Sequence, residues 1–169
     1  MHTKLIAVLA LAGALLAPLC AWAGPNIIYV TRHAEKAAAD QDPALSAQGA
    51  ARARTLAAIL RKAAIRAVFS TPTKRTQQTA GPLAQQAGLE VQLYDAAKPA
   101  LVVDRIKAMA GPTLLVGHSN TIAELVTLLG GAPGTQIADD EYDRLYQVAI
   151  ATDGTVTTVM LSSVVASSF

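Results

Sequence analysis

Short apolar runs rich in β-branched residues alternate along the chain with longer segments whose apolar residues recur at helical spacing. The runs predict strands at 26–31, 67–70, 90–94, 113–117, 145–152 and 155–162. The helical spacing predicts helices at 46–62, 71–87, 99–109 and 119–129. This alternation predicts an α/β three-layer sandwich, with a mostly parallel central sheet and helices on both faces. The last two strands flank Asp153-Gly154, which predicts a C-terminal antiparallel hairpin.

The first helix has a clear start. Ser46 is placed as its N-cap, and Leu56, Ile59 and Leu60 are expected on its apolar face.

The ends of the later helices are also marked in the sequence. Thr71-Pro72 is expected to open the second helix with proline in its first turn, and Gly88 is expected to close it. Ser119 is a candidate cap for the helix that follows residue 118.

The N-terminus has the features of a secretory signal peptide over residues 1–23. Lys4 gives it a positive start, residues 5–19 are apolar, and small residues precede an expected cleavage after Ala23. Residues 24–169 would then form a single domain, exported to the periplasm or secreted, without stable membrane insertion after cleavage. The alternative is a segment retained as an N-terminal anchor. Cys20, the only cysteine, would be removed with the signal.

Composition narrows the possible partners. The chain has 14 basic and 12 acidic residues, and no basic run is interleaved with aromatic residues, so nucleic acid is not expected as a partner. Two histidines beyond residue 2, with no cysteine, make a poor ligand set for zinc or iron. We therefore expect no metal and no cofactor.

Two histidines occupy equivalent places in the predicted sheet. Arg32-His33 follows the first strand, and His118 follows the strand at 113–117. The carboxyl ends of parallel strands meet at one edge of such a sheet, where ligands bind. Both histidines are therefore expected in one site. The alternative for each is a structural histidine that only ends its strand.

Lys74 and Arg75 are expected in the first turn of the second helix. A helix N-terminus disfavours cations, so the pair is unexpected there unless an anion such as phosphate is bound. The alternative is that both side chains extend into solvent. Two arginines and two histidines could surround a tetrahedral oxyanion, and Ser119 could reach it from the start of a helix.

These residues form an ordered set of motifs. They are Arg32-His33-Ala34-Glu35, residues 45–49, residues 70–80 and Gly117-His118. The set resembles the histidine phosphatase superfamily, also called phosphoglycerate mutase-like, over residues 26–160. Ala34 replaces the usual glycine, and Thr76 stands where alanine is common. The short link from Gly88 to Gly111 lacks the insertion of larger members, so we expect a shallow, open site.

The resemblance implies a phosphatase in which His33 is the nucleophile and forms a phosphohistidine. Arg32, Arg75 and His118 would hold the phosphoryl oxygens without a metal. The sequence leaves the general acid open. Asp95, just after a strand, is one candidate, and it could instead be a turn residue or an N-cap. Glu35 is the other candidate, and it could instead be a structural carboxylate that orients the loop.

The partner implied is a small phosphorylated substrate or a phosphoprotein. Two alternatives to a phosphatase remain: phosphoglycerate-mutase-type phosphotransfer, and a non-catalytic phosphate-binding module on the same fold. The acidic residues at 139–143 do not match a calcium-binding loop and are expected to form a solvated loop before the final hairpin.

Overall fold

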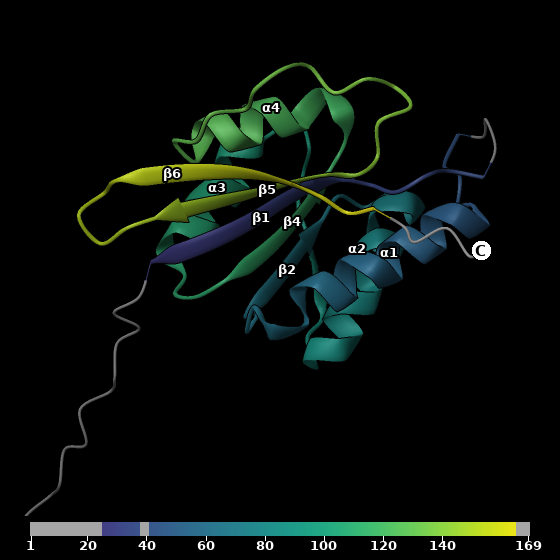
Figure 1. Ribbon diagram of the computed structural model, residues 1–169, viewed down its shortest axis with the longest axis horizontal. Helices are drawn as coiled ribbons and strands as arrows, with labels where there is room; N and C mark the ends of the chain where they lie inside the picture. Colours follow the sequence, from purple (N-terminus) through teal and green to yellow (C-terminus); the bar gives the residue numbers. More distant parts are fainter. Residues whose placement is uncertain (1–24, 38–40, 165–169) are drawn as a thin grey trace, which may run out of the picture.

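The computed structural model describes residues 25–37 and 41–164, and the expected signal segment lies outside them. A six-stranded sheet runs through the molecule in the order β3-β2-β4-β1-β5-β6 (Figure 1). Its strands are β1 (Asn26–Arg32), β2 (Ala67–Ser70), β3 (Val91–Leu93), β4 (Thr113–Gly117), β5 (Arg144–Ile150) and β6 (Val156–Ser162).

The first four strands of this order are parallel, and β5 and β6 add an antiparallel hairpin. The register pairs Arg32 on β1 with Gly117 on β4, and Ser70 on β2 with Val116 on β4. The carboxyl ends of β1, β2 and β4 therefore lie together at one edge of the sheet. The α/β fold class, the mixed sheet and the terminal hairpin are confirmed.

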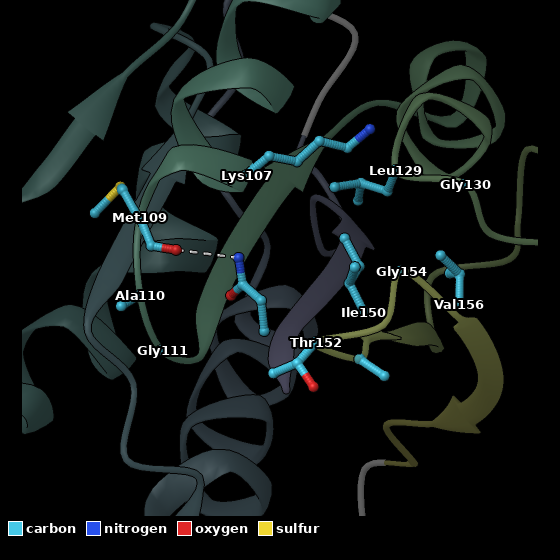
Figure 2. Close-up of a pocket in the computed structure, with 12 residues that line it drawn as sticks. Lys107, Met109, Ala110, Gly111, Leu129, Gly130, Ile150, Thr152, Gly154 and Val156 are labelled. Atoms are coloured by element: carbon cyan, nitrogen blue, oxygen red, sulfur yellow. Dashed lines mark hydrogen bonds between the residues drawn. The ribbon is translucent and has the colours of Figure 1, made fainter. Parts of the chain in front are cut away.

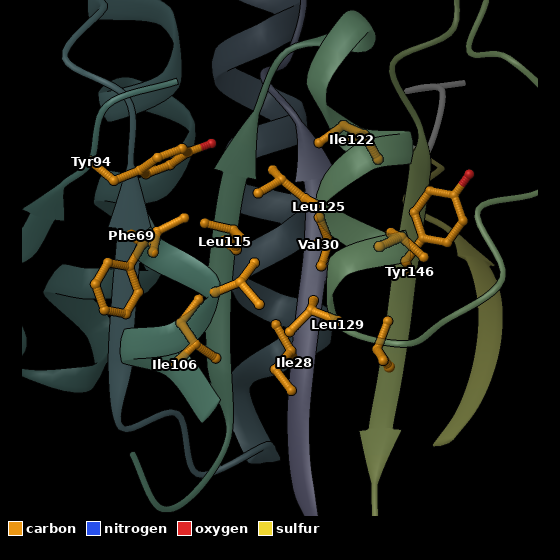
Figure 3. Packing of buried hydrophobic residues seen from close by; sticks show 14 of the residues in the cluster. Ile28, Val30, Phe69, Tyr94, Ile106, Leu115, Ile122, Leu125, Leu129 and Tyr146 are labelled. Atoms are coloured by element: carbon orange, nitrogen blue, oxygen red, sulfur yellow. The ribbon is translucent and has the colours of Figure 1, made fainter. Parts of the chain in front are cut away.

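Two pairs of helices cover the two faces of the sheet (Figure 1). α1 (Ala47–Ile59) and α2 (Lys74–Ala87) lie on one face, and a short 3₁₀ turn at Leu60–Lys62 follows α1. α3 (Pro99–Ala108) and α4 (Ser119–Leu128) lie on the other. Figure 3 shows the apolar layer between the sheet and these last two helices.

The parallel strands are apolar on both sides because both faces are covered. Ile28 and Val30 on β1 pack in the cluster with α3 and α4, whereas Tyr29 between them packs in the cluster with α1 and α2. Leu114 and Leu115 on β4 divide in the same way. The alternation fixes the strand faces, so the residue that ends each strand has a defined direction.

The start of α1 is confirmed, and its apolar face is corrected at one position. The Ser46 side chain accepts a hydrogen bond from the backbone N–H of Gly49. Leu56 and Leu60 are buried, but Ile59 is 45% exposed. The buried stripe runs through Ala53, Leu56 and Leu60, and Ile59 lies about 100° around the helix from Leu60.

The second helix begins later than expected, at Lys74, and Pro72 precedes it instead of occupying its first turn. The α region is disfavoured for a residue before proline, which discourages a helix from including Thr71. Thr73 has the extended dihedrals of an N-cap. Gly88 ends the helix with a left-handed φ of 66°, as predicted.

The start of α4 also differs from expectation. His118 occupies the N-cap position, and Ser119 is the first helical residue. The backbone N–H of His118 donates to the Thr121 hydroxyl at 3.0 Å, which fixes the turn from β4 into the helix. Across the ranges that the structure describes, no helix combines the length and apolar character needed to span a bilayer.

Candidate active site

The sheet edge formed by the carboxyl ends of β1, β2 and β4 carries an open, polar cavity of about 450 Å³. Arg32, His33, Arg75 and His118, which come from three separate segments of the sequence, all line it. Ser119 lines it as well. Its remaining lining residues are Lys36, Gln41, Pro43, Asn120 and Asp139. The expected convergence of two imidazoles and two guanidinium groups is present in the fold.

His33 is held in one orientation at the end of β1. It is 5% exposed, its backbone N–H donates to the Gly117 carbonyl at 2.9 Å, and its Nδ1 lies 2.7 Å from the Ala34 carbonyl. A carbonyl can only accept, so this contact places the ring proton of a neutral His33 on Nδ1 and leaves a lone pair on Nε2.

The surroundings keep His33 uncharged. Burial is the largest influence, and together with the positive charges of Arg32 and Arg75 and the nearby His118 it lowers the pKa of His33 from 6.5 to about 4. The hydrogen bond to the Ala34 carbonyl opposes this shift. At neutral pH the imidazole is therefore unprotonated, next to the positive charges of Arg32 and Arg75.

His118 faces His33 from the N-terminus of α4. The two ring centroids are 5.4 Å apart with an interplanar angle of 67°. Burial, followed by the charges of Arg75 and Arg32, lowers the pKa of His118 to about 4. Its Nε2 lies 3.0 Å from the Thr71 hydroxyl, so Nε2 is engaged by the protein itself.

A buried network of hydroxyl groups stands behind His118. The Thr76 hydroxyl lies 2.8 Å from the Thr71 hydroxyl and also donates to the carbonyls of Thr71 and Thr73. Thr71 and Thr76 are almost fully buried. Thr76 is the position where the superfamily motif commonly has alanine, and here its side chain connects the start of α2 to the second histidine.

Arg32 is immobilised by the segment that leads into β5. It is 7% exposed, and its Nη1 donates to the carbonyls of Ala138, Asp139 and Glu141 at 2.9–3.0 Å. The Tyr142 ring lies 4.2 Å from its guanidinium carbon, within the range of a cation–π contact. Its Nε is buried and has no hydrogen-bond partner among the described residues.

Asp42 partly explains why two cations, Lys74 and Arg75, are tolerated at the start of α2. The Asp42 carboxylate accepts the backbone N–H of Lys74 at 2.9 Å and lies 3.7 Å from Nη1 of Arg75. A carboxylate of the chain itself therefore offsets the charge at this helix N-terminus. Lys74 does not line the cavity, whereas Arg75 does.

Glu35 lies outside the cavity and pairs with Arg52, which donates to it through Nε at 3.0 Å and Nη2 at 2.6 Å. Burial would raise the pKa of Glu35, but the hydrogen bonds and charge of Arg52 outweigh it and lower the pKa. Arg52 also donates to the Ser163 carbonyl. This geometry favours a structural carboxylate over a proton donor, the alternative that the sequence had left open.

Asp95 lies just beyond β3, exposed, in a turn. Its carboxylate accepts the backbone N–H of Ala97 at 2.9 Å, and Lys98 occupies the N-cap position of α3. Asp95 does not line the polar cavity, but it lines a neighbouring cavity that also contains His118. Asp95 is therefore a turn residue, as one of the alternatives for it expected, and not the N-cap of α3. Because it shares a cavity with His118, it also remains a candidate for the general acid.

The backbone after His33 accepts alanine where the superfamily has glycine. Ala34 is buried, its N–H donates to the Thr79 hydroxyl at 3.0 Å, and it is not among the described residues with a positive φ.

Sequence reasoning missed the contribution of residues 138–142. Residues 139–143 were expected to form only a solvated loop, yet this segment and Ala138 before it supply the carbonyls and the aromatic ring that hold Arg32, and Asp139 lines the cavity. Backbone carbonyls carry no residue-type signal, so only the adjacency of Tyr142 to an acidic run could have drawn attention to this segment.

A second large cavity, about 510 Å³, lies at the opposite end of the sheet (Figure 2). Met109, Leu129, Ile150 and Val156 are among the residues that line it. Figure 2 shows the Met109 carbonyl accepting a hydrogen bond from the side chain of Asn26. Neither imidazole nor guanidinium groups occur in its lining.

Two imidazoles, two guanidinium groups and a helix N-terminus at a sheet edge are groups suited to binding an oxyanion such as phosphate. Residues 28–98 match the sequence model of the histidine phosphatase superfamily (branch 1), and this segment contains Arg32, His33 and Arg75. The resemblance inferred from the motifs is therefore confirmed over this part of the chain. No curated protein sequence matches the chain.

Solved structures agree on the fold. The protein histidine phosphatase SixA, complexed with tungstate, aligns with a TM-score of 0.64 at 20% identity, over 81% of this chain and 97% of its own. The mycobacterial glucosyl-3-phosphoglycerate phosphatase aligns with a TM-score of 0.64 at 16% identity, over 82% and 98%. An Entamoeba histolytica phosphoserine phosphatase, in complex with 3-phosphoglyceric acid, gives 0.62 at 16% identity, over 82% and 97%. The superfamily and these phosphatase neighbours support a phosphatase.

Proposed function

We propose that the protein is a metal-independent phosphatase that hydrolyses a phosphomonoester, or a phosphohistidine, through a covalent phosphohistidine on His33. The hydrogen bond from His33 Nδ1 to the Ala34 carbonyl carries the proposal, because it leaves Nε2 unprotonated on a residue that lines a cavity with cationic groups. The SixA neighbour is itself described as a protein histidine phosphatase, which keeps phosphohistidine among the proposed substrates.

In the first step, Nε2 attacks phosphorus as the bond from phosphorus to the leaving atom breaks; that atom is oxygen in a phosphomonoester and nitrogen in a phosphohistidine. Arg32, Arg75 and His118 would hold the three other phosphoryl oxygens, whose charge must be balanced throughout the transfer. The guanidinium groups supply positive charge that a metal ion provides in other phosphoryl-transfer enzymes, which is why we propose that no metal is needed.

In the second step, water attacks the phosphohistidine, the bond from phosphorus to Nε2 breaks, and inorganic phosphate leaves with His33 restored. The cavity is open to solvent, so water has access to the intermediate. A mutase would need to shield this intermediate. Hydrolysis is therefore favoured over transfer to a second substrate position.

The experiment is turnover of p-nitrophenyl phosphate by the full chain and its His33→Ala variant, with and without EDTA. We expect phosphate release that EDTA does not affect and that the variant lacks. An alkaline quench followed by mass measurement should show one added phosphoryl group on wild type only. Undiminished release by His33→Ala would refute the nucleophile. Tight phosphate binding without an intermediate would indicate a binding module, and transfer without phosphate release would indicate a mutase.

Asp95 is our proposed proton donor to the leaving oxygen, from the cavity that it shares with His118. Asp95→Asn should lower kcat/KM for an alkyl phosphate by about 100-fold, because an alkoxide leaves poorly without a proton. For p-nitrophenyl phosphate, whose leaving group needs no proton, the loss should be less than about threefold. Equal losses for both substrates would contradict this role.

We also propose that the protein is exported to the periplasm or secreted after cleavage following Ala23, on the strength of the basic, apolar and small-residue pattern of residues 1–23. The mass of the N-terminal peptide from cell fractions tests this proposal. A soluble form that begins at Gly24 is expected, whereas an intact N-terminus in the membrane fraction would indicate a retained anchor.

A further inference from the structure

A third cavity, also of about 510 Å³, adjoins the polar cavity through His118, which lines both. We call it the Leu93 cavity, and it is distinct from the cavity at the opposite end of the sheet. Two segments form its walls. Thr71, Pro72 and Thr73 come from the junction of β2 and α2, and residues 93–96 follow β3. A phosphoryl group held by Arg32, Arg75 and His118 therefore has this cavity as an immediate neighbour, and the rest of the substrate must extend beyond the phosphoryl group.

The walls of the Leu93 cavity are mainly apolar. Leu93, at the end of β3, is 51% exposed although it is a large aliphatic residue. Pro72 and the ring of Tyr94 add further apolar surface. Exposed apolar surface that continues from a polar site is a common mark of ligand binding.

Most polar groups in these walls are already engaged within the protein. The Tyr94 hydroxyl donates to the Val116 carbonyl at 3.2 Å. The hydroxyl groups of Thr71 and Thr73 each lie 2.8 Å from that of Thr76. A sugar or polyol entering the cavity would lose water from its hydroxyl groups and gain few partners in return, which is costly.

The remaining charged group is Asp95, whose carboxylate is exposed at this cavity. Because we propose Asp95 as the proton donor to the leaving oxygen, its carboxyl group marks where the organic group begins. The other walls of the cavity favour apolar groups over polyols.

We propose that this cavity is the leaving-group subsite and that it selects phosphates of neutral, apolar groups of about the size of one ring, with Leu93 as a specificity-determining residue. This inference rests on the proposed phosphatase function. It divides the substrate between two surfaces that meet at His118: the polar cavity takes the phosphoryl group, and the Leu93 cavity takes the organic group that departs with the oxygen.

The test compares two primary phosphate esters on six-membered rings, cyclohexylmethyl phosphate and glucose 6-phosphate, so that the leaving oxygens are alike and the hydroxyl groups differ. For the full chain we expect kcat/KM to favour the apolar ester by about 10- to 100-fold. Leu93→Gln should reduce this preference by about 5- to 10-fold, chiefly through KM, whereas Leu93→Met should retain it.

The matched control is Met160→Gln, another exposed apolar position (60%) on β6, which should leave the preference unchanged. The inhibition constant of inorganic phosphate should be the same in wild type and Leu93→Gln, since phosphate fills only the polar cavity. This measurement also shows that the variant is folded.

An equal or reversed preference in wild type, or a Leu93→Gln preference equal to wild type, would overturn the subsite while leaving the phosphatase intact. If the proposed phosphatase function is wrong, the result is different: no phosphate is released from p-nitrophenyl phosphate or from either ester. The proposed subsite would then be refuted as well.

Discussion

The two ends of the sheet carry cavities of similar size and opposite chemistry. The cavity at the carboxyl ends of the parallel strands, about 450 Å³, contains both described histidines, Arg32 and Arg75. The cavity at the other end, about 510 Å³, has Lys107 as the charged group of its lining (Figure 2). That ammonium group donates to the Leu128 carbonyl at 2.7 Å. The larger cavity therefore offers less for catalysis.

The difference comes from strand direction. Strand β1 begins with Asn26 at one edge of the sheet and ends with Arg32 at the opposite edge. The turns that follow β1, β2 and β4 all lie at the Arg32 edge. At the first edge the Asn26 amide donates to the Ile106 and Met109 carbonyls and closes the sheet against α3. Polar groups there stabilise the fold, whereas polar groups at the opposite edge remain available to a ligand.

The largest expected difference between the two ends of the sheet is in activity, and Arg75→Gln tests it. Loss of a guanidinium that balances phosphoryl charge should lower kcat/KM for p-nitrophenyl phosphate by about 100- to 1,000-fold. Lys107→Gln, at the opposite end, also removes one positive charge and should change it by less than about twofold. Steady-state kinetics of both variants provide the measurement, and comparable losses in the two would contradict the assignment of the site.

The second-largest expected difference between the two ends of the sheet is in how the stability of the protein depends on pH. His33 has its pKa lowered from 6.5 to about 4 on folding, so the unfolded chain binds the proton more readily between these values. The contribution of His33 to the free energy of unfolding is thus complete above pH 6.5 and should fall by on the order of 3 kcal/mol as the pH drops to 4.

Urea unfolding of wild type and His33→Gln across this range measures the effect. The variant should lose less stability than wild type between pH 6.5 and 4, and Lys107→Gln should follow wild type. Parallel curves for wild type and His33→Gln would show that His33 titrates normally in the folded protein.

Thr71→Val should have the smallest effect of the three. It removes the hydroxyl that contacts His118 Nε2 but keeps the shape of the side chain, so kcat should fall by about tenfold as His118 loses its orientation. Thr71→Ser should retain most of the activity. The pH profile of kcat should shift in Thr71→Val and not in Thr71→Ser, and a shift in neither would limit Thr71 to packing.

Prediction from sequence worked best where a residue type and a local element act together. Arg32, His33 and His118 were placed correctly because each follows an apolar strand, and strand order alone brings such positions to one edge. The Ser46 cap and the left-handed Gly88 likewise depend on neighbours within a few residues.

Prediction failed where distant segments decide the outcome. The pairing of Glu35 with Arg52 and the capping of α2 by Asp42 join segments that only the folded chain brings together. Local propensity contains none of these contacts.

The three backbone carbonyls that hold Arg32 have a consequence for the thermodynamics of recognition. A long, flexible side chain normally loses rotamer freedom when a ligand binds, at a cost of about 0.5–1.5 kcal/mol. Here that entropy has already been lost during folding, so an incoming oxyanion meets a donor that is rigid beforehand. Calorimetry of oxyanion binding should accordingly show only a small entropic penalty from this arginine.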